Sequence, residues 1–249
     1  RGPDEPQRPV VLEELGPEER QQEWTYKQFP LHWAAIQTHL GNCFAALGEY
    51  EYGTARLEQA VGSHRAALTV VSPERDLLQW ATIKNNLGSA LLALGEREIG
   101  LGEEAKGRKR LEEAETVLRA ALEGRSRKRV PLHWADTQDN LGIVLAVLGQ
   151  QEGNMEKLEQ AIKAYEEALK ERTPDRVPLR WAETQNNLGW ALLILGVRTQ
   201  DRATLEEARE AVSGALEMFI QAGQDYRQSQ SKALLHEIDQ QLRRLPPPP

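Results

Sequence analysis

The chain has 249 residues, of which 40% are apolar, 28% charged and 6% aromatic, and its formal net charge is −7. This composition is typical of a soluble helical protein, and the negative charge argues against general affinity for nucleic acid or anionic membranes. No stretch approaches the ~20 consecutive apolar residues of a membrane-spanning helix. Since no signal pattern opens the chain either, we expect a cytoplasmic protein without a membrane partner.

Residues 1–29 form a predicted lead-in. Residues 1–9 hold three prolines, two acids and a glycine, a composition that indicates a linker. A short helix is predicted from Gly16 to about Lys27, because Pro17 suits a first helical position. Residues 23–33 then align without a gap on residues 171–181, so the lead-in is interpreted as a short helix or a degenerate half-repeat.

Four copies of one pattern follow in residues 30–223. Each has a Trp-Ala pair, a Leu-Gly pair seven residues after the Trp, and a second Leu-Gly further on. The tryptophans are Trp33, Trp80, Trp134 and Trp181, at steps of 47, 54 and 47 residues. A fixed period in this range indicates a stacked array of repeats. The predicted repeats span 30–76, 77–130, 131–177 and 178–223.

Each repeat is predicted to be a helical hairpin. The first helix starts near the Pro-Leu-x-Trp element, buries one apolar face and ends at the second Gly, which we expect to be its C-cap. Cys43 falls on this apolar face, so a buried thiol is expected. The second helix is built on Leu-Glu-x-Ala. The second repeat is seven residues longer, around residues 100–107, and this insertion is predicted to lengthen its hairpin.

A final amphipathic helix is predicted over residues 224–245, followed by a proline tail at 246–249. Its polar outer face is what a capping helix at the end of a repeat array requires. The predicted fold class is therefore all-α, an α-solenoid of four long helix-turn-helix repeats with a C-terminal cap.

The repeats resemble the tetratricopeptide repeat, through Leu188-Gly189, Leu192, Ala208 and Val212 and the matching residues of the other three copies. That repeat is about 34 residues long, whereas these are longer, and Gln185 stands at its usual Trp site. We interpret the difference as an extra helical turn, similar to the long repeats of kinesin-light-chain-type proteins.

The resemblance implies a non-enzymatic scaffold that binds an extended peptide segment of a protein partner in a concave groove. The first helix of each repeat would line this groove. Asn86, Asn140 and Asn187 recur at one position of that helix, where the family uses Asn to bond the backbone of a bound peptide. The alternative, that these amides bond neighbouring helices, stays open. The predicted peptide-binding residues are His39, Asn42, Asn86, Asp136, Asp139, Asn140, Ile143, Glu183, Asn187, Trp190 and Ile194.

Asp136, Asp139 and Glu183 predict an acidic end of the groove, and therefore a partner with a basic residue beside an apolar one. Trp190 is either a core residue or an exposed anchor. Basic clusters at residues 106–110 and 125–129 are interpreted as solvated helix ends.

No catalytic motif, phosphate-binding loop or metal-ligand set is recognisable, so we expect no enzyme, cofactor or metal. Two alternatives remain for the function. One is a sensor or regulatory segment of a larger protein, motivated by the absence of an initiating Met and by the proline-rich ends. The other is a self-associating scaffold.

Overall fold

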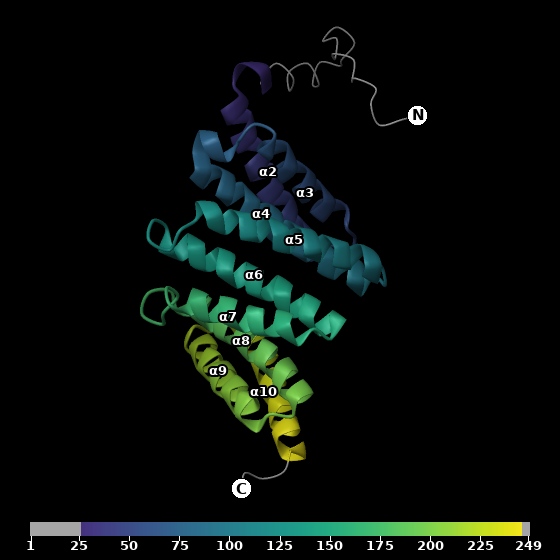
Figure 1. The fold of residues 1–249 in the computed structure, drawn as a ribbon, viewed down its shortest axis with the longest axis vertical. Helices are drawn as coiled ribbons and strands as arrows, with labels where there is room; N and C mark the ends of the chain where they lie inside the picture. The colour runs from purple at the N-terminus through teal and green to yellow at the C-terminus, as the bar shows by residue number, and fades with distance from the viewer. Residues whose placement is uncertain (1–25, 246–249) are drawn as a thin grey trace.

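The computed structural model describes residues 26–245. These residues form helices joined by short turns, and no strand occurs among them. Within these residues four helical hairpins follow one another along the long axis, and α10 lies at the C-terminal end (Figure 1). The all-α solenoid is therefore confirmed, whereas the predicted lead-in helix lies almost entirely outside the described residues. The hairpins pair α2 (Pro30–Tyr50) with α3 (Ala55–Leu68), α4 (Pro73–Gly100) with α5 (Glu104–Gly124), α6 (Pro131–Glu152) with α7 (Met155–Leu169), and α8 (Pro178–Thr199) with α9 (Arg202–Gln221); α10 is Asp225–Arg244.

Local signals set the helix starts. Proline occupies the first turn of α2, α4, α6 and α8, where a missing backbone N–H costs nothing. In α4 the backbone leaves helical geometry at Asp76, and the Asp76 carboxylate accepts from the backbone N–H of Gln79 at 2.9 Å. Asp76 thus caps the long part of α4, as Asn154 caps α7 and Asp201 caps α9.

The second glycine of each repeat does not end its helix, so the predicted C-cap is wrong. Each first helix continues past it, and α6 and α8 end instead with Gly153 and Gln200 in the left-handed conformation. The repeat glycines lie where the second helix comes closest. A methyl group on Gly196 would lie 2.9 Å from the Leu205 side chain, and one on Gly189 only 2.2 Å from Val212. These positions are small because two helix backbones meet there.

The hairpins share a core that runs from α3 to α10. It is made mainly of leucine and alanine, and the alanine of each Leu-Glu-x-Ala element is fully buried. These alanines are Ala60, Ala114, Ala161 and Ala208. Because every hairpin packs on the next, the buried face of one first helix is covered by the second helix of the preceding hairpin.

The helices form two rows. The first helices contact one another in sequence, α2 with α4, α4 with α6, α6 with α8, and α8 with α10. Among α3, α5, α7 and α9, no Cα atom of one helix lies within 8 Å of another. Long side chains bridge this outer row, for example Arg65 to Glu113 at 2.5 Å and Lys157 to Glu115 at 2.8 Å. The closely spaced first helices are therefore the inner row.

The insertion in the second repeat lengthens the α4–α5 hairpin, as predicted. The two helices cross where a methyl group on Gly107 would lie 2.5 Å from the carbonyl oxygen of Gly95. Beyond the crossing, the fully buried Glu98 faces Lys106 at 3.0 Å and Arg110 at 3.6 Å. These two members of the first basic cluster therefore compensate a buried carboxylate, which corrects their interpretation as a purely solvated helix end.

The cap α10 keeps the register of a first helix. Arg227 pairs with Glu183 as Arg180 pairs with Asp136, each across 44 residues. In that register His236 and Arg243 stand where the repeats have their two glycines, for example Gly189 and Gly196. Side chains of this size leave no room for a second helix to pack on α10 as it does on the other first helices.

Candidate functional site: the groove of the first helices

A cavity of about 260 Å³ lies on the inner row between α6, α8 and α10. Four predicted site residues line it, Asp139 and Ile143 from α6 and Glu183 and Asn187 from α8. The remaining lining residues are Asn186, Phe219, Arg227 and Gln230. The structure thus brings part of the predicted set together at one place, next to the cap.

The three asparagines of the predicted ladder are half-buried and face the preceding first helix. Asn86 Nδ2 donates to Asn42 Oδ1 at 3.1 Å. Asn140 Nδ2 donates to Ser89 Oγ at 2.9 Å and to Asn85 Oδ1 at 3.2 Å. Burial raises the pKa of Asp139, and a hydrogen bond from the adjacent Asn187 partly opposes that rise. The amides therefore bond neighbouring helices, the second of the two interpretations of these residues.

These hydrogen bonds use only part of the hydrogen-bonding capacity of the three amides. A primary amide has two N–H donors and an oxygen with two lone pairs, so one or two bonds leave capacity for another partner. Asn86, Asn140 and Asn187 are only half-buried, so part of each is open to solvent, and Asn187 lines the cavity. The same side chains can therefore bond a neighbouring helix and still offer a hydrogen bond to a peptide.

Beneath the groove, Arg172 holds two carboxylates of α6. Its guanidinium lies 2.8 Å from Asp136 Oδ1 and 3.0 Å from Asp139 Oδ2, and it donates to Thr184 Oγ1 at 2.6 Å. Burial raises the pKa of Asp139, while Arg172, Thr184 and Asn187 act in the opposite direction. An arginine on the loop after α7 therefore fixes α6 and α8 relative to each other.

The predicted acidic end of the groove is corrected by these contacts. Asp136 also accepts from Arg180 at 2.9 Å, and Glu183 pairs with Arg227 on α10. Each of the three carboxylates thus has an arginine partner, and Asp139 is buried. A paired carboxylate attracts a further cation only weakly, so these residues give no specific support for a basic partner.

The apolar and N-terminal members of the predicted set lie elsewhere. Trp190 is half-buried and packs against the main core, and Ile194 is also half-buried; neither lines the cavity. His39 and Asn42 are exposed on α2, at the opposite end of the array, and so is Cys43, which was expected to be buried. The set therefore spreads along the inner row and gathers only around the α6–α8–α10 cavity.

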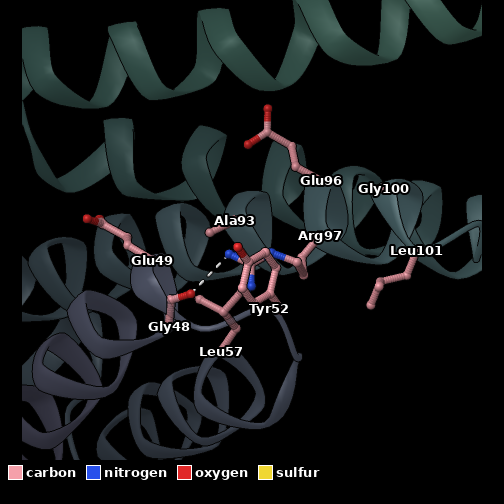
Figure 2. A pocket seen from close by; sticks show the side chains of 9 residues that line it. All are labelled: Gly48, Glu49, Tyr52, Leu57, Ala93, Glu96, Arg97, Gly100 and Leu101. Carbon is pink, nitrogen blue, oxygen red and sulfur yellow. Dashed lines mark hydrogen bonds between the residues drawn. The ribbon is translucent and has the colours of Figure 1, made fainter. Parts of the chain in front are cut away.

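A larger cavity of about 590 Å³ lies at the other end of the array, where the end of α2 and the turn after it meet the end of α4 (Figure 2). Its arginine, Arg97, donates to the carbonyl oxygens of Gly48 at 3.0 Å and Gly53 at 3.2 Å, and also to Glu51. Arg198 donates to Gln150 in the same way at 2.7 Å. Because these arginines satisfy the last carbonyls of the preceding first helix, their role is capping.

Sequence reasoning missed two groups of residues. Arg125 and Arg172 are buried, nine residues before Trp134 and Trp181, and donate to the equivalent Thr137 and Thr184. Aligning the repeats shows both pairs, so the signal was available. Arg227 and Gln230 are the other group, and they become visible only when α10 is aligned as a first helix.

The fold defines an α-solenoid of helical repeats, whose inner row of helices carries polar side chains such as Asn86, Asn140 and Asn187. Residues 134–175, which span most of α6 and α7, match the tetratricopeptide repeat family. The α6–α7 hairpin therefore matches a tetratricopeptide repeat, and the other three hairpins carry the same Leu-Gly and Leu-Glu-x-Ala pattern. No curated protein matches the chain.

None of the helices within residues 26–245 is long and apolar enough to cross a membrane. These residues also hold no group of three or more His, Cys, Asp or Glu side chains arranged for a metal ion. Tetratricopeptide repeats generally mediate protein–protein interactions.

Proposed function

We propose that the protein is a non-enzymatic scaffold that holds an extended peptide segment of a cytoplasmic protein partner along the first helices. The observation that carries this proposal is the cavity between α6, α8 and α10, which combines residues predicted from two repeats with residues of the cap. Its volume of about 260 Å³ suits one side chain of a peptide, with the flanking backbone lying along the groove.

The chemistry of the lining favours recognition of a peptide main chain beside an apolar side chain. Asn186, Asn187 and Gln230 offer amide donors and acceptors, which match a backbone that presents both. Ile143 and Phe219 offer apolar surface to the side chain between them. Because the carboxylates are paired with arginine, the partner needs an apolar residue at this place more than a basic one.

The test is selection of peptides from a displayed random library on the whole chain, followed by affinity measurements on variants. Ile143→Arg places a long cation in the cavity. Ile162→Arg is the matched control, because Ile162 is also half-buried against the main core but lies on α7 in the outer row. Thermal melts of both variants report any loss of folding.

Selected peptides should lose at least about tenfold in affinity for the Ile143→Arg variant and retain it for Ile162→Arg, because loss of an apolar anchor is worth about 1.4 kcal/mol or more. If the library yields no binder, or both variants lose affinity equally, the groove proposal is wrong.

A further inference from the structure

A cavity of about 370 Å³ lies between α8 and α9 and shares no lining residue with the α6–α8–α10 cavity. The Trp181 ring forms one wall and reaches over Gly214, where a methyl group would lie 3.2 Å from the ring. Trp181 is half-buried, whereas Leu188 of the lining is buried. The exposed carboxylates of Glu207 and Glu210 complete the lining together with Gln185 and Ala211. We call this cavity the Trp181 pocket.

Two of the other repeat tryptophans already hold a cation of the chain against the indole ring. Lys84 Nζ lies over the Trp80 ring, 5.4 Å from its centroid. The guanidinium of Arg127 lies over the Trp134 ring at 5.7 Å. The negative face of an indole attracts a cation within about 6 Å, and tryptophan does so best among the aromatic residues. A cation on the repeat tryptophan is therefore a feature of the α4 and α6 repeats.

The α8 repeat has the tryptophan without the cation. The equivalent of Lys84 on α8 is Gln185, and Pro174 stands at the position of Arg127. In the part of the chain that the structure describes, no Lys or Arg lies over the Trp181 ring. The ring is nevertheless accessible, because it lines the Trp181 pocket. The α8 repeat can therefore take this cation from another molecule.

The charge of the Trp181 pocket is negative and uncompensated. Within residues 26–245, neither Glu207 nor Glu210 has an ion-pair partner. Arg209, which lies between them in the sequence, faces Asp239 of α10 instead, at 3.9 Å. A cation on the indole would therefore lie beside two carboxylates that no other side chain neutralises.

The outer row shows the same lack of positive charge at this place. At its first two junctions, an arginine of one outer helix donates to an acceptor on the next, for example Arg119 of α5 to Gln160 of α7 at 2.8 Å. At the junction of α7 with α9, the equivalent of Arg119 is Glu166, and the equivalent of Gln160 is Glu207. Because a carboxylate replaces the arginine, a cation from outside would restore the bridge.

We propose that the Trp181 pocket binds an arginine side chain of a protein partner, with the guanidinium stacked on the indole and paired with Glu207 and Glu210. Arginine suits the pocket better than lysine, because its planar guanidinium stacks on aromatic rings and pairs with carboxylates through two bonds. Its methylene stem matches the apolar surface of Leu188 and Ala211. The site is separate from the groove of the first helices and does not rest on the peptide proposed there.

The test uses two peptides, acetyl-Gly-Arg-Gly-Arg-Gly-amide and the same peptide with citrulline in place of arginine, which keeps the shape and removes the charge. Binding to the whole ¹⁵N-labelled chain is followed through the indole N–H resonance of Trp181. Gln185→Lys copies Lys84 and supplies the cation from the chain itself. Gln138→Lys is the matched control, because it makes the same change on α6, where Arg127 already covers Trp134. Thermal melts report the folding of both variants.

We expect the arginine peptide to shift the Trp181 resonance saturably and the citrulline peptide to leave it unchanged. Gln185→Lys should weaken binding at least about tenfold, as should Glu207→Gln with Glu210→Gln, whereas Gln138→Lys should retain it. Ile143→Arg should also retain it, which separates this site from the groove. The proposal is overturned if the Trp181 resonance does not shift, if citrulline binds as well as arginine, or if both lysine variants weaken binding equally, since only net charge would then matter.

Discussion

Replacing Gly189 by alanine tests whether the repeat glycines exist for close helix packing. The added methyl carbon would lie 2.2 Å from Val212 Cγ2 and 3.0 Å from the carbonyl oxygen of Ala208. Val212 is fully buried, and the carbonyl belongs to the backbone of α9, so neither moves away easily. Overpacking of this kind costs about 1–3 kcal/mol, and these contacts favour the upper end of that range.

The matched control is Gly62→Ala on α3, where a methyl group would meet nothing within 4 Å. Both substitutions gain the helix propensity of alanine over glycine, about 1 kcal/mol. The difference between the two variants in free energy of unfolding is therefore the packing cost alone. Urea denaturation followed by far-ultraviolet circular dichroism should place Gly189→Ala about 3 kcal/mol below Gly62→Ala.

A compensating variant sharpens the result. Val212→Ala in the Gly189→Ala background removes the colliding methyl group, so the two changes together should cost less than their sum by about 1 kcal/mol or more. If Gly189→Ala is as stable as Gly62→Ala, the close approach of α8 and α9 does not explain the repeated glycine.

Two further predictions concern buried ionisable groups. Burial lowers the pKa of His64 to about 4, below its usual value near 6.5. The unfolded chain therefore binds a proton more readily than the folded one, and the free energy of unfolding should fall by about 3 kcal/mol between pH 6.5 and pH 4. His64→Leu, which copies Leu118 of the next hairpin, should flatten this dependence in urea titrations at several pH values; an unchanged slope would contradict it. Arg172→Met should cost about 3–5 kcal/mol at pH 7, because it leaves the buried Asp139 without its cation. That deficit should narrow towards pH 4, since burial already raises the pKa of Asp139 and a neutral carboxyl needs no cation. Arg125 donates to a hydroxyl and a carbonyl, so Arg125→Met should lower the free energy of unfolding less than Arg172→Met does at pH 7. An equal loss of stability in the two variants would refute the reasoning.

The repeats were readable from the sequence because their packing is periodic. Every hairpin needs a small residue where the helices meet and large apolar residues on either side, so the Leu-Gly pairs recur at fixed places. The same logic failed at the second glycine, for example Gly149, where a small residue was taken for a helix end. Glycine serves both purposes, and only the position of Leu158 against Gly149 distinguishes them.

The charge of the groove was not predictable from the first helices alone. Asp139 and Glu183 are visible on α6 and α8, but their partners Arg172 and Arg227 come from a loop and from the cap. Cys43 was misplaced for a related reason, because its face was assumed to be covered as in later repeats. Both errors arise because burial and charge on a first helix depend on residues outside that helix.

The two rows of helices differ in the bonds that hold them. Amide hydrogen bonds such as Asn86 to Asn42, direct helix contacts and ion pairs such as Arg180 to Asp136 join the inner row, whereas ion pairs between long side chains such as Arg65 to Glu113 span the outer row, whose helix backbones do not contact one another. Salt screens ion pairs between full charges, but it has little effect on hydrogen bonds between neutral amides. We therefore expect the array to bend about its inner row of first helices, while the distances between the outer helices change. Ionic strength would then alter the curvature of the solenoid mainly by loosening its outer row.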